Sequence, residues 1–214
     1  MSTLSQLMWV EKYRPIDFKE LVDQKPVVER LTSMLESPGE MPHLLFTGPP
    51  GVGKTTAALC VSRAIMKDYW RDFTLELNAS DERGINTVRE RVKTFARYVD
   101  RRVDIPFRII ILDEADEMTS DAQTALRRIM EESSRFCRFI LIANYSSNII
   151  EPIQSRCAIF RFTVLEKENV VSYLEKICRK EGVRCEKAAL TLVYDVSGGD
   201  LRHAMNLLQA SAAI

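Results

Sequence analysis

The chain has 214 residues, of which 46% are hydrophobic and 28% charged, a composition typical of a globular protein. Its 30 basic residues balance its 30 acidic ones, so the net charge indicates no class of partner. No apolar run approaches the roughly 20 residues of a membrane span, and residues 1–8 lack the charged start and apolar centre of a signal peptide, so we expect no membrane association.

Five short apolar runs are predicted to be strands: His43–Thr47, Phe73–Leu77, Phe107–Leu112, Phe139–Ala143 and Ala158–Phe162. Helical patterns lie between them, and short apolar strands separated by helices indicate an α/β fold, with a parallel sheet covered on both faces. Ligands of such sheets bind beyond the carboxyl ends of the strands. Polar residues at those ends are therefore the candidate site residues.

The pattern changes after Phe162, where no further strand is evident. Three helices are predicted there, over Glu166–Lys180, Glu186–Val196 and Leu201–Ala213. A helical unit of about 50 residues is too small to be robust alone. We therefore predict an α/β domain over residues 1–162 and a small three-helix domain over residues 163–214 that docks on it.

The five cysteines are odd in number, and no pair has Cys-x-x-Cys spacing; they are Cys60, Cys137, Cys157, Cys178 and Cys185. This number and spacing of cysteines argue for a reducing cellular compartment. They also argue against a zinc module or a disulfide framework.

The most specific local motif is Gly48–Thr55, which fits the P-loop pattern G-x-x-x-x-G-K-[ST] at every fixed position. Its three glycines allow the backbone amides to turn around an anion, at the start of a helix whose dipole favours negative charge. Lys54 can reach the outer phosphates of a nucleotide, and the Thr55 hydroxyl can bind Mg²⁺. A predicted strand before the loop and a helical pattern after it supply the expected context.

A second motif is the apolar run Phe107–Leu112 followed by Asp113-Glu114-Ala115-Asp116. Asp113 would lie at the carboxyl edge of the sheet, where it can hold Mg²⁺ directly or through water. Glu114 is then placed to polarise a water for attack on a γ-phosphate. A solvated loop or helix start is the alternative for an acidic tetrad, and the P-loop upstream favours the catalytic interpretation.

Three further polar residues are candidates, each with a simpler alternative. Asn144 could hydrogen-bond the attacking water and a γ-phosphate oxygen, or could only start a turn. Arg156, in Ser155-Arg156-Cys157, could be an arginine finger or a surface ion pair. Arg202 follows Gly198-Gly199-Asp200 in a first helical turn, where a cation opposes the helix dipole unless an anion lies nearby; pairing with Asp195 or Asp200 is the alternative.

In that order these motifs resemble the AAA+ ATPases. Three longer strings resemble more closely the replication factor C small subunits, the clamp loaders of archaea and eukaryotes: Trp9–Pro15, Leu77–Ile85 and Ile149–Cys157. The resemblance covers nearly the whole chain. Bacterial clamp-loader ATPases carry a four-cysteine zinc insert after the first strand, and its absence favours the archaeal and eukaryotic type.

The resemblance implies ATP and Mg²⁺ as ligands and an ATPase whose site is shared between subunits. Lys54, Glu114 and Asn144 would be catalytic in cis, and Arg156 would act in trans on the neighbouring subunit's ATP. Thr55 and Asp113 would hold the metal. Val22-Asp23-Gln24 and the segment from Val10 would line the adenine pocket, or equally anchor the N-terminus. The full set expected at the nucleotide is Val10, Tyr13, Arg14, Pro15, Val22, Gly48, Pro49, Pro50, Gly51, Val52, Gly53, Lys54, Thr55, Thr56, Asn144 and Arg202.

The family also implies partners: a large subunit and further small subunits in a pentamer, the sliding clamp, and primer-template DNA. It implies an archaeal cytoplasm, which we favour, or a eukaryotic nucleus. Family members continue into a C-terminal helical collar that holds the pentamer together. The sequence stops at Ile214, about where a lid would end, so we expect no collar here, which leaves stable assembly in doubt.

A DNA-facing helix is predicted over Asn86–Val99, with Val88, Val92, Phe95 and Val99 on one face. A basic stripe lies beside that face, interrupted by Glu90, and is made by Arg89, Lys93 and Arg97, with Arg83 just upstream. Such a stripe can follow phosphates without reading bases, or can simply be a solvated face. The family resemblance favours DNA. Arg127 and Arg128 could reach a phosphate across a subunit boundary, but we expect an intramolecular ion pair.

Two other functions fit parts of the sequence. A subunit that binds nucleotide only for assembly, and hydrolyses little or none, would not need Glu114, Asn144 and Arg202. A P-loop kinase for a small metabolite would need an acceptor pocket and a closing lid, and the Ser-Arg-Cys string fits it poorly. We therefore expect a clamp-loader ATPase subunit.

Overall fold

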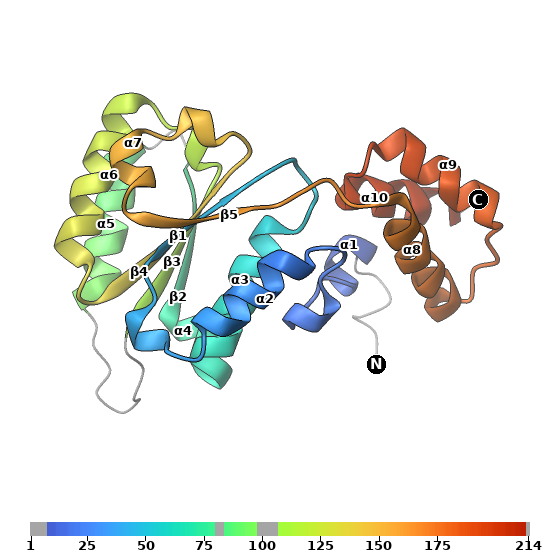
Figure 1. Ribbon diagram of the computed structural model, residues 1–214, viewed down its shortest axis with the longest axis horizontal. Helices are drawn as coiled ribbons and strands as arrows, with labels where there is room; N and C mark the ends of the chain where they lie inside the picture. Colours follow the sequence, from blue (N-terminus) through green and yellow to red (C-terminus); the bar gives the residue numbers. More distant parts are fainter. Residues whose placement is uncertain (1–7, 80–83, 98–106, 213–214) are drawn as a thin grey trace.

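The computed structural model of the chain describes residues 8–79, 84–97 and 107–212, with the backbone alone at 84–87, 96 and 97. Figure 1 shows a larger α/β part and a smaller helical part, with the N-terminal helix α1 lying between them. Among the described residues, no helix has the length and apolar character needed to cross a membrane.

The larger part is built on a five-stranded parallel sheet in the order β2-β3-β4-β1-β5. The predicted sheet is therefore confirmed, with strand ends within two residues of those predicted: β1 His43–Thr47, β2 Thr74–Asn78, β3 Arg108–Asp113, β4 Cys137–Ala143 and β5 Cys157–Arg161. β4 pairs with both β1 and β3, so the carboxyl ends of these three strands lie side by side. These ends carry the P-loop, Asp113 and Asn144.

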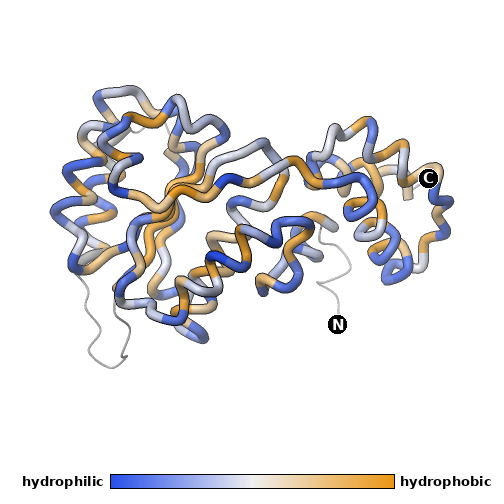
Figure 2. The backbone as a smooth tube through the Cα atoms, viewed as in Figure 1, coloured by the Kyte–Doolittle hydropathy of each residue, from blue (hydrophilic) through white to orange (hydrophobic). Residues whose placement is uncertain are grey.

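Helices cover both faces of the sheet (Figure 1). One face is covered by α2 Lys25–Met34, α3 Lys54–Met66 and α4 Trp70–Phe73, and the other by α5 Gly84–Arg97, α6 Ser120–Ser133 and α7 Glu151–Gln154. Successive residues of a strand pack on opposite faces of the sheet. Leu44 and Phe46 belong to the hydrophobic core on one face and Leu45 to the core on the other. Figure 2 shows the strands as the most hydrophobic part of the chain and the outer helices as mixed.

Short 3₁₀ helices connect several of these elements. They are η1 Phe18–Glu20, η2 Pro38–Glu40, η3 Lys67–Tyr69, η4 Ala115–Glu117 and η5 Ser146–Asn148. Two of them, η4 and η5, follow β3 and β4 at the carboxyl edge of the sheet, so they shape the same edge as the P-loop.

The smaller part contains α8 Lys167–Glu181, α9 Lys187–Ser197 and α10 Leu201–Ala212, close to the three helices predicted. Its core is continuous with that of the first sheet face. Helix α1, Trp9–Lys12, makes much of the connection, since the Trp9 side chain is buried and the Trp9 backbone N–H donates to Oε1 of Gln209 at 2.8 Å. The boundary predicted at residue 162 falls in the segment between β5 and α8 and stays a prediction.

Candidate nucleotide-binding site

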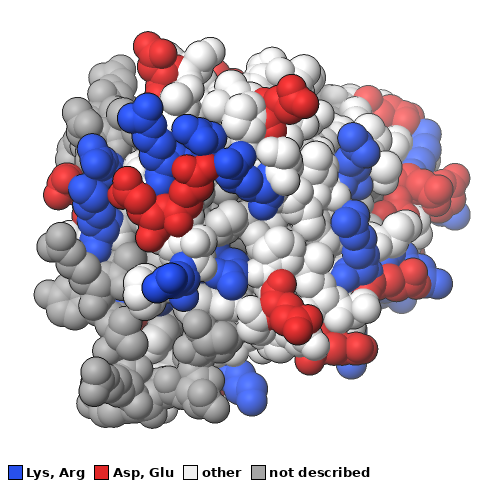
Figure 3. Space-filling model, turned by 60° about the vertical axis from the view of Figure 1, so that its left-hand side comes forward, with Lys and Arg blue, Asp and Glu red and all other residues white. Residues whose placement is uncertain are grey.

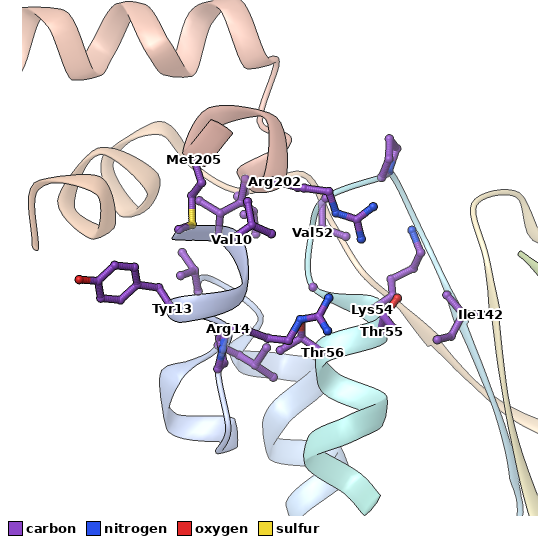
Figure 4. Close-up of a pocket in the computed structure, with 18 of the residues that line it drawn as sticks. Val10, Tyr13, Arg14, Val52, Lys54, Thr55, Thr56, Ile142, Arg202 and Met205 are labelled. Atoms are coloured by element: carbon purple, nitrogen blue, oxygen red, sulfur yellow. The ribbon is translucent and has the colours of Figure 1, made fainter. Parts of the chain in front are cut away.

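A cavity of about 240 Å³ lies where the P-loop, the N-terminal segment and the helical part meet (Figure 4). Most of the predicted nucleotide residues line it: Val10, Tyr13, Arg14, Pro15, Val22, Pro50, Gly51, Val52, Gly53, Lys54, Thr55, Thr56, Asn144 and Arg202, with Asp113 and Glu114. Gly48, Pro49 and Arg156 are not among the lining residues. The P-loop, the Asp113-Glu114 pair, Asn144 and Arg202, which are far apart in the sequence, therefore converge on one cavity.

The P-loop backbone depends on its three glycines, since Gly48, Gly51 and Gly53 all have a positive φ. Gly48 has φ of +143° and Gly51 has φ of +70°, values that side-chain-bearing residues rarely adopt. A Cβ on Gly48 would collide with the carbonyl of Phe162, and one on Gly51 with the carboxylate of Asp200. The Leu201 N–H also donates to the Gly51 oxygen at 3.2 Å. The loop thus packs directly against the first residues of α10, so it links the geometry of the cavity to that of the helical part α8–α10, which we call the lid.

Lys54 is buried at the first position of α3, and its ammonium group is held by three oxygens. Nζ donates to the carbonyl oxygens of Gly48 and Pro49, each at 2.6 Å, and to Oδ1 of Asn144 at 2.9 Å. Gly48 and Pro49 thus position this lysine instead of lining the cavity. Burial lowers the pKa of Lys54 to about 8, an effect that the nearby carboxylates of Asp113 and Asp116 partly oppose.

Thr55 and Asp113 provide a pair of hard oxygen ligands beside Lys54. Oγ1 of Thr55 donates to Oδ2 of Asp113 at 2.7 Å, although the two residues come from α3 and β3. The described residues contain no group of three or more His, Cys, Asp or Glu side chains suited to a metal. One carboxylate and one hydroxyl fit Mg²⁺, which keeps water ligands and takes others from substrate phosphates.

Glu114 occupies a left-handed backbone conformation, with φ of +54°, immediately after β3. For a residue with a side chain this costs about 1–2 kcal/mol. The turn reverses the chain into η4, Ala115–Glu117, and leaves the exposed Glu114 side chain on the cavity wall. Its N–H donates to Oδ1 of Asp113 at 2.9 Å. Strain of this kind is tolerated at functional sites, where position matters more than conformational ease.

Asn144 is fixed through its backbone by Asp116, a residue of the acidic motif for which we predicted no role from sequence. Oδ2 of the buried Asp116 accepts hydrogen bonds from the N–H groups of Asn144 at 2.9 Å and Tyr145 at 3.0 Å. Oδ1 of Asp116 has no hydrogen-bond partner within the described part of the chain. The Asn144 side chain also accepts a hydrogen bond from Lys54. The acidic motif after β3 and the asparagine after β4 are therefore both connected to the P-loop lysine.

Arg202 projects from the first turn of α10 towards the P-loop, and Arg14 points at the same segment from below (Figure 4). Within residues 8–79, 84–97 and 107–212, Arg202 has no ion pair. Asp195 pairs instead with Lys167 at 2.7 Å, and Asp200 accepts from the His203 N–H at 3.0 Å as the helix cap. The pairings with Asp195 or Asp200 that were the alternative for Arg202 are therefore not formed, and the Arg202 guanidinium faces the cavity, where an anion could bind it.

The cavity is also lined by apolar and aromatic side chains that sequence reasoning missed: Leu21, Ile142, Leu165, Tyr173, Leu201 and Met205. Tyr13 and Val10 line it as predicted, but the Tyr13 hydroxyl donates to Glu181 of α8 at 2.5 Å. Burial and this carboxylate raise the pKa of Tyr13 to about 12. The N-terminal segment thus both lines the cavity and anchors the lid.

Asp23 and Gln24, expected in the adenine pocket, do not line the cavity. The Gln24 amide donates to the Thr163 carbonyl at 2.9 Å. Asp23 accepts from the Glu166 N–H at 2.6 Å and from the Asn169 side chain at 2.8 Å. Both residues therefore hold in place the segment that leads into α8. They do so by hydrogen-bonding backbone groups of Thr163 and Glu166, which are not paired within a helix or strand.

Arg156 lies away from the cavity of its own chain. Its guanidinium donates to the Pro152 carbonyl at 2.7 Å and to Oε1 of Glu131 at 2.6 Å. Glu131 also binds Arg127 at 3.0 Å, the intramolecular pair expected for that arginine. Arg156 is about one-third exposed, so it remains accessible on the surface. Whatever it contributes to catalysis, it does not contribute to the site formed by this chain.

Gln123 is a buried polar residue that connects these parts, and sequence reasoning missed it. Its amide nitrogen donates to the carbonyls of Met118 at 3.2 Å and Asn148 at 2.7 Å, and its oxygen accepts from the Ile150 N–H at 2.8 Å. It joins α6 to the loop that leads from Asn144 towards Arg156. The available signal was a polar side chain three residues before Leu126, on the apolar face of its helix.

The predicted DNA stripe is described only in part. On α5, Arg89 is exposed and Lys93 half-buried, while Val92, on the neighbouring apolar face, is buried. Arg83 and the side chain of Arg97 lie outside the described residues. Figure 3, which brings the α5–α6 side forward, shows basic and acidic side chains interleaved over the described surface.

Comparison with known proteins identifies the class. Residues 44–164 match the ATPase family associated with various cellular activities (AAA), and residues 172–213 match the RCF1/5-like AAA+ ATPase lid domain. The chain therefore belongs to the AAA family. Solved structures of Thermotoga maritima RuvB, described as a Holliday junction branch migration motor, share the fold at a TM-score of 0.73 and 18% identity, over 92% of this chain and 64% of that one.

More similar in sequence are proteins named replication factor C small subunit. The chain is 56% identical over 212 residues to the one from Aeropyrum pernix and 54% identical over 211 residues to that of Staphylothermus marinus. It is 57% identical over 210 residues to small subunit 2 of Pyrobaculum islandicum. These matches cover 98–99% of this chain, which spans 64–65% of the length of those relatives.

Proposed function

We propose that this chain binds ATP with Mg²⁺ and hydrolyses it as a subunit of a clamp loader, which opens a sliding clamp and places it on primer-template DNA. The observation that carries the ATPase part is the convergence of Lys54, Thr55, Asp113, Glu114 and Asn144 on one cavity that Arg202 also faces. The replication factor C small subunits, at 54–57% identity, support the clamp-loader part.

The proposed chemistry follows from what each side chain can do. Thr55 and Asp113 hold Mg²⁺, which when bound neutralises charge on the phosphates. Lys54 and Arg202 supply positive charge from the two domains, and Lys54 exchanges its carbonyl partners for phosphate oxygens. Glu114 accepts the hydrogen bond of the attacking water and Asn144 orients that water, so hydrolysis depends on positioning and charge.

The apolar end of the cavity suits the adenine base. Val10, Val22 and Met205 present aliphatic and thioether surface there, and Tyr13 and Tyr173 lie beside them. Two of these side chains, Tyr173 and Met205, come from the lid. A base bound in this position contacts both domains, so nucleotide binding and lid position depend on each other.

The site is proposed to be completed by a second subunit. Arg156 lies outside its own cavity and on the surface, as required of a group that acts on a neighbour's ATP. To do so, Arg156 must break its ion pair with Glu131, a carboxylate that it shares with Arg127. The γ-phosphate of the neighbour's ATP carries more negative charge and is therefore the stronger partner. The partners are further small subunits and a large subunit, and we place the assembly in an archaeal cytoplasm, as the relatives named above suggest.

The lowered pKa of Lys54 predicts how nucleotide affinity depends on pH. The amine loses its proton as the pH rises through about 8, and only the charged form attracts phosphate. Affinity for MgATP should therefore be level below pH 8 and fall by up to about tenfold per pH unit above it. The measurement is a titration with fluorescent ATP from pH 6.5 to 9.5, for the natural chain and for Lys54→Ala.

Dividing the two affinities at each pH removes the titration of the nucleotide itself. The ratio should decline above pH 8, because Lys54→Ala has no amine to titrate. A ratio that stays constant to pH 9.5 would show that Lys54 keeps its charge, or that it does not contact phosphate.

DNA is proposed to contact α5 through phosphates. Arg89 and Lys93 are one turn apart on the helix and neither forms an ion pair with another described residue, so both can release counterions on binding. Replacing both with alanine should weaken primer-template binding and reduce the slope of log affinity against log salt by about 2. ATP affinity should not change, since neither residue lines the cavity.

Lys176→Ala is the matched control, because this exposed lysine lies on α8 of the lid. It should leave both the DNA affinity and the salt slope unchanged. DNA binding that is unaffected by the Arg89 and Lys93 substitutions, or equally weakened by the Lys176 substitution, would remove α5 as the DNA-facing element.

A further inference from the structure

Two cysteines of the lid lie in contact. Sγ of Cys178, in the last turn of α8, is 2.8 Å from Sγ of Cys185, which precedes α9. Cys178 is buried and Cys185 half-buried, so one member of the pair is accessible. The buried Cys60 has a different surrounding, with its sulfur 3.9 Å from the Pro15 carbonyl oxygen.

The end of α8 explains why residues seven positions apart meet. Gly182 takes the left-handed conformation, with φ of +69°, that commonly ends a helix. The Val183 N–H then donates back to the Cys178 carbonyl at 2.9 Å, across the last turn. This hydrogen bond reverses the chain and directs the following residues over the helix end. Cys185 is therefore brought to Cys178 by the helix cap itself.

We propose that Cys178 and Cys185 are an oxidisable pair, which forms an intramolecular disulfide by exchange with a small disulfide such as oxidised glutathione. The bond would join the last turn of α8 to the segment leading into α9. The sulfur atoms need to move by less than about 1 Å, because a disulfide bond is about 2.05 Å long. This site is independent of the nucleotide chemistry proposed above.

The order of the exchange follows from exposure. The accessible Cys185 thiolate attacks one sulfur of oxidised glutathione, which releases one glutathione thiolate and leaves a mixed disulfide. Cys178 then gives up its proton and attacks the Cys185 sulfur, which expels the second glutathione. Two protein thiols are oxidised and one glutathione disulfide is reduced to two thiols. Burial raises the pKa of Cys178 to about 12, so this thiol is a poor first nucleophile.

The bond would act on the anchor between the lid and the N-terminal segment. Glu181 lies three residues after Cys178 and binds both Lys12 Nζ at 2.6 Å and the Tyr13 hydroxyl at 2.5 Å. A covalent link across residues 178–185 holds the turn that follows Glu181 and removes conformations from the unfolded chain. We expect the melting temperature to rise by about 5 °C on oxidation.

The test uses the full chain, incubated with oxidised glutathione, alkylated under denaturing conditions and digested with trypsin. The expected product is Ile177-Cys178-Arg179 linked to Cys185-Glu186-Lys187, together with a higher melting temperature that a reductant reverses. Cys185→Ser should abolish both, since it changes the half-buried member and leaves the buried Cys178 in place. Cys157→Ser, at a half-buried cysteine of β5, should abolish neither.

Three outcomes would overturn the proposal. The first is that no linked peptide forms while Cys178 and Cys185 are both alkylated. The second is that Cys185 stops as a stable mixed disulfide with glutathione. The third is that the linked peptide forms equally well in the presence of a denaturant at which the lid is unfolded, since the proposal depends on the folded helix end bringing the sulfurs together.

Discussion

Glu114→Gln is expected to lower the rate of ATP hydrolysis by about 10²–10⁴-fold while leaving ATP affinity within about twofold. Glutamine keeps the length of the side chain and can still adopt the left-handed conformation, with φ of +54°, that this position requires. It lacks the negative charge that polarises water. The ATPase rate under saturating MgATP and the dissociation constant for ATP, measured on the same preparations, check the two halves of the expectation.

Glu117→Gln is the matched control for this variant. Glu117 is an exposed carboxylate three residues further on, in the 3₁₀ turn that follows Glu114, and it does not line the cavity. Its replacement should leave hydrolysis unchanged. If both variants lost the same share of the hydrolysis rate, the negative charge of this turn as a whole would matter and not the Glu114 carboxylate in particular. If Glu114→Gln hydrolysed ATP at the normal rate, Glu114 would have no catalytic role.

Arg156→Ala is the second substitution with a large expected effect. Under conditions that allow subunits to assemble, we expect a loss of about 10³-fold in ATP hydrolysis, the lower end of what an arginine finger contributes. ATP affinity should hold, because Arg156 lies outside the cavity of its own chain. Without assembly the natural chain should itself hydrolyse ATP slowly, and Arg156→Ala should then have little effect.

Glu131→Gln separates the catalytic role of Arg156 from an ion-pair role. Glu131 is the carboxylate that binds Arg156 at 2.6 Å and Arg127 at 3.0 Å. If Arg156 served only that exposed ion pair, Glu131→Gln would cost as much activity as Arg156→Ala. If Arg156 acts on a neighbour's ATP, Glu131→Gln should keep most of the activity, since it leaves the arginine in place and frees it.

The parts of the site that could be predicted from sequence are those whose chemistry is local. The P-loop requires its glycines, lysine and threonine within eight residues, so the pattern alone placed them together. Asp113 and Asn144 were found because parallel strands present their carboxyl ends at one edge. Strand and helix ends were within about two residues, because burial and caps set those ends and apolar runs mark them only approximately.

The residues that were missed or misplaced depend on how the lid docks. Tyr173 and Met205 are apolar positions of α8 and α10 that look like ordinary core positions until the lid meets the P-loop. Asp23 and Gln24 were expected in the cavity, but their polar groups satisfy the backbone and the Asn169 side chain at the start of α8. Such long-range hydrogen bonds leave no periodic signal. The contact of Cys178 with Cys185 was missed for a similar reason, since the turn at Gly182 creates it.

The central claim is that Lys54 of each chain acts on the ATP bound by that chain, whereas Arg156 acts on the ATP bound by the neighbouring subunit. It is tested most directly by mixing Lys54→Ala with Arg156→Ala protein under assembly conditions and measuring ATP hydrolysis. Each variant alone should be nearly inactive, and the mixture should recover activity, because an Arg156→Ala subunit with an intact P-loop can receive the arginine of a Lys54→Ala neighbour. A mixture that stays as inactive as either variant, although the subunits are shown to assemble, would contradict the shared site.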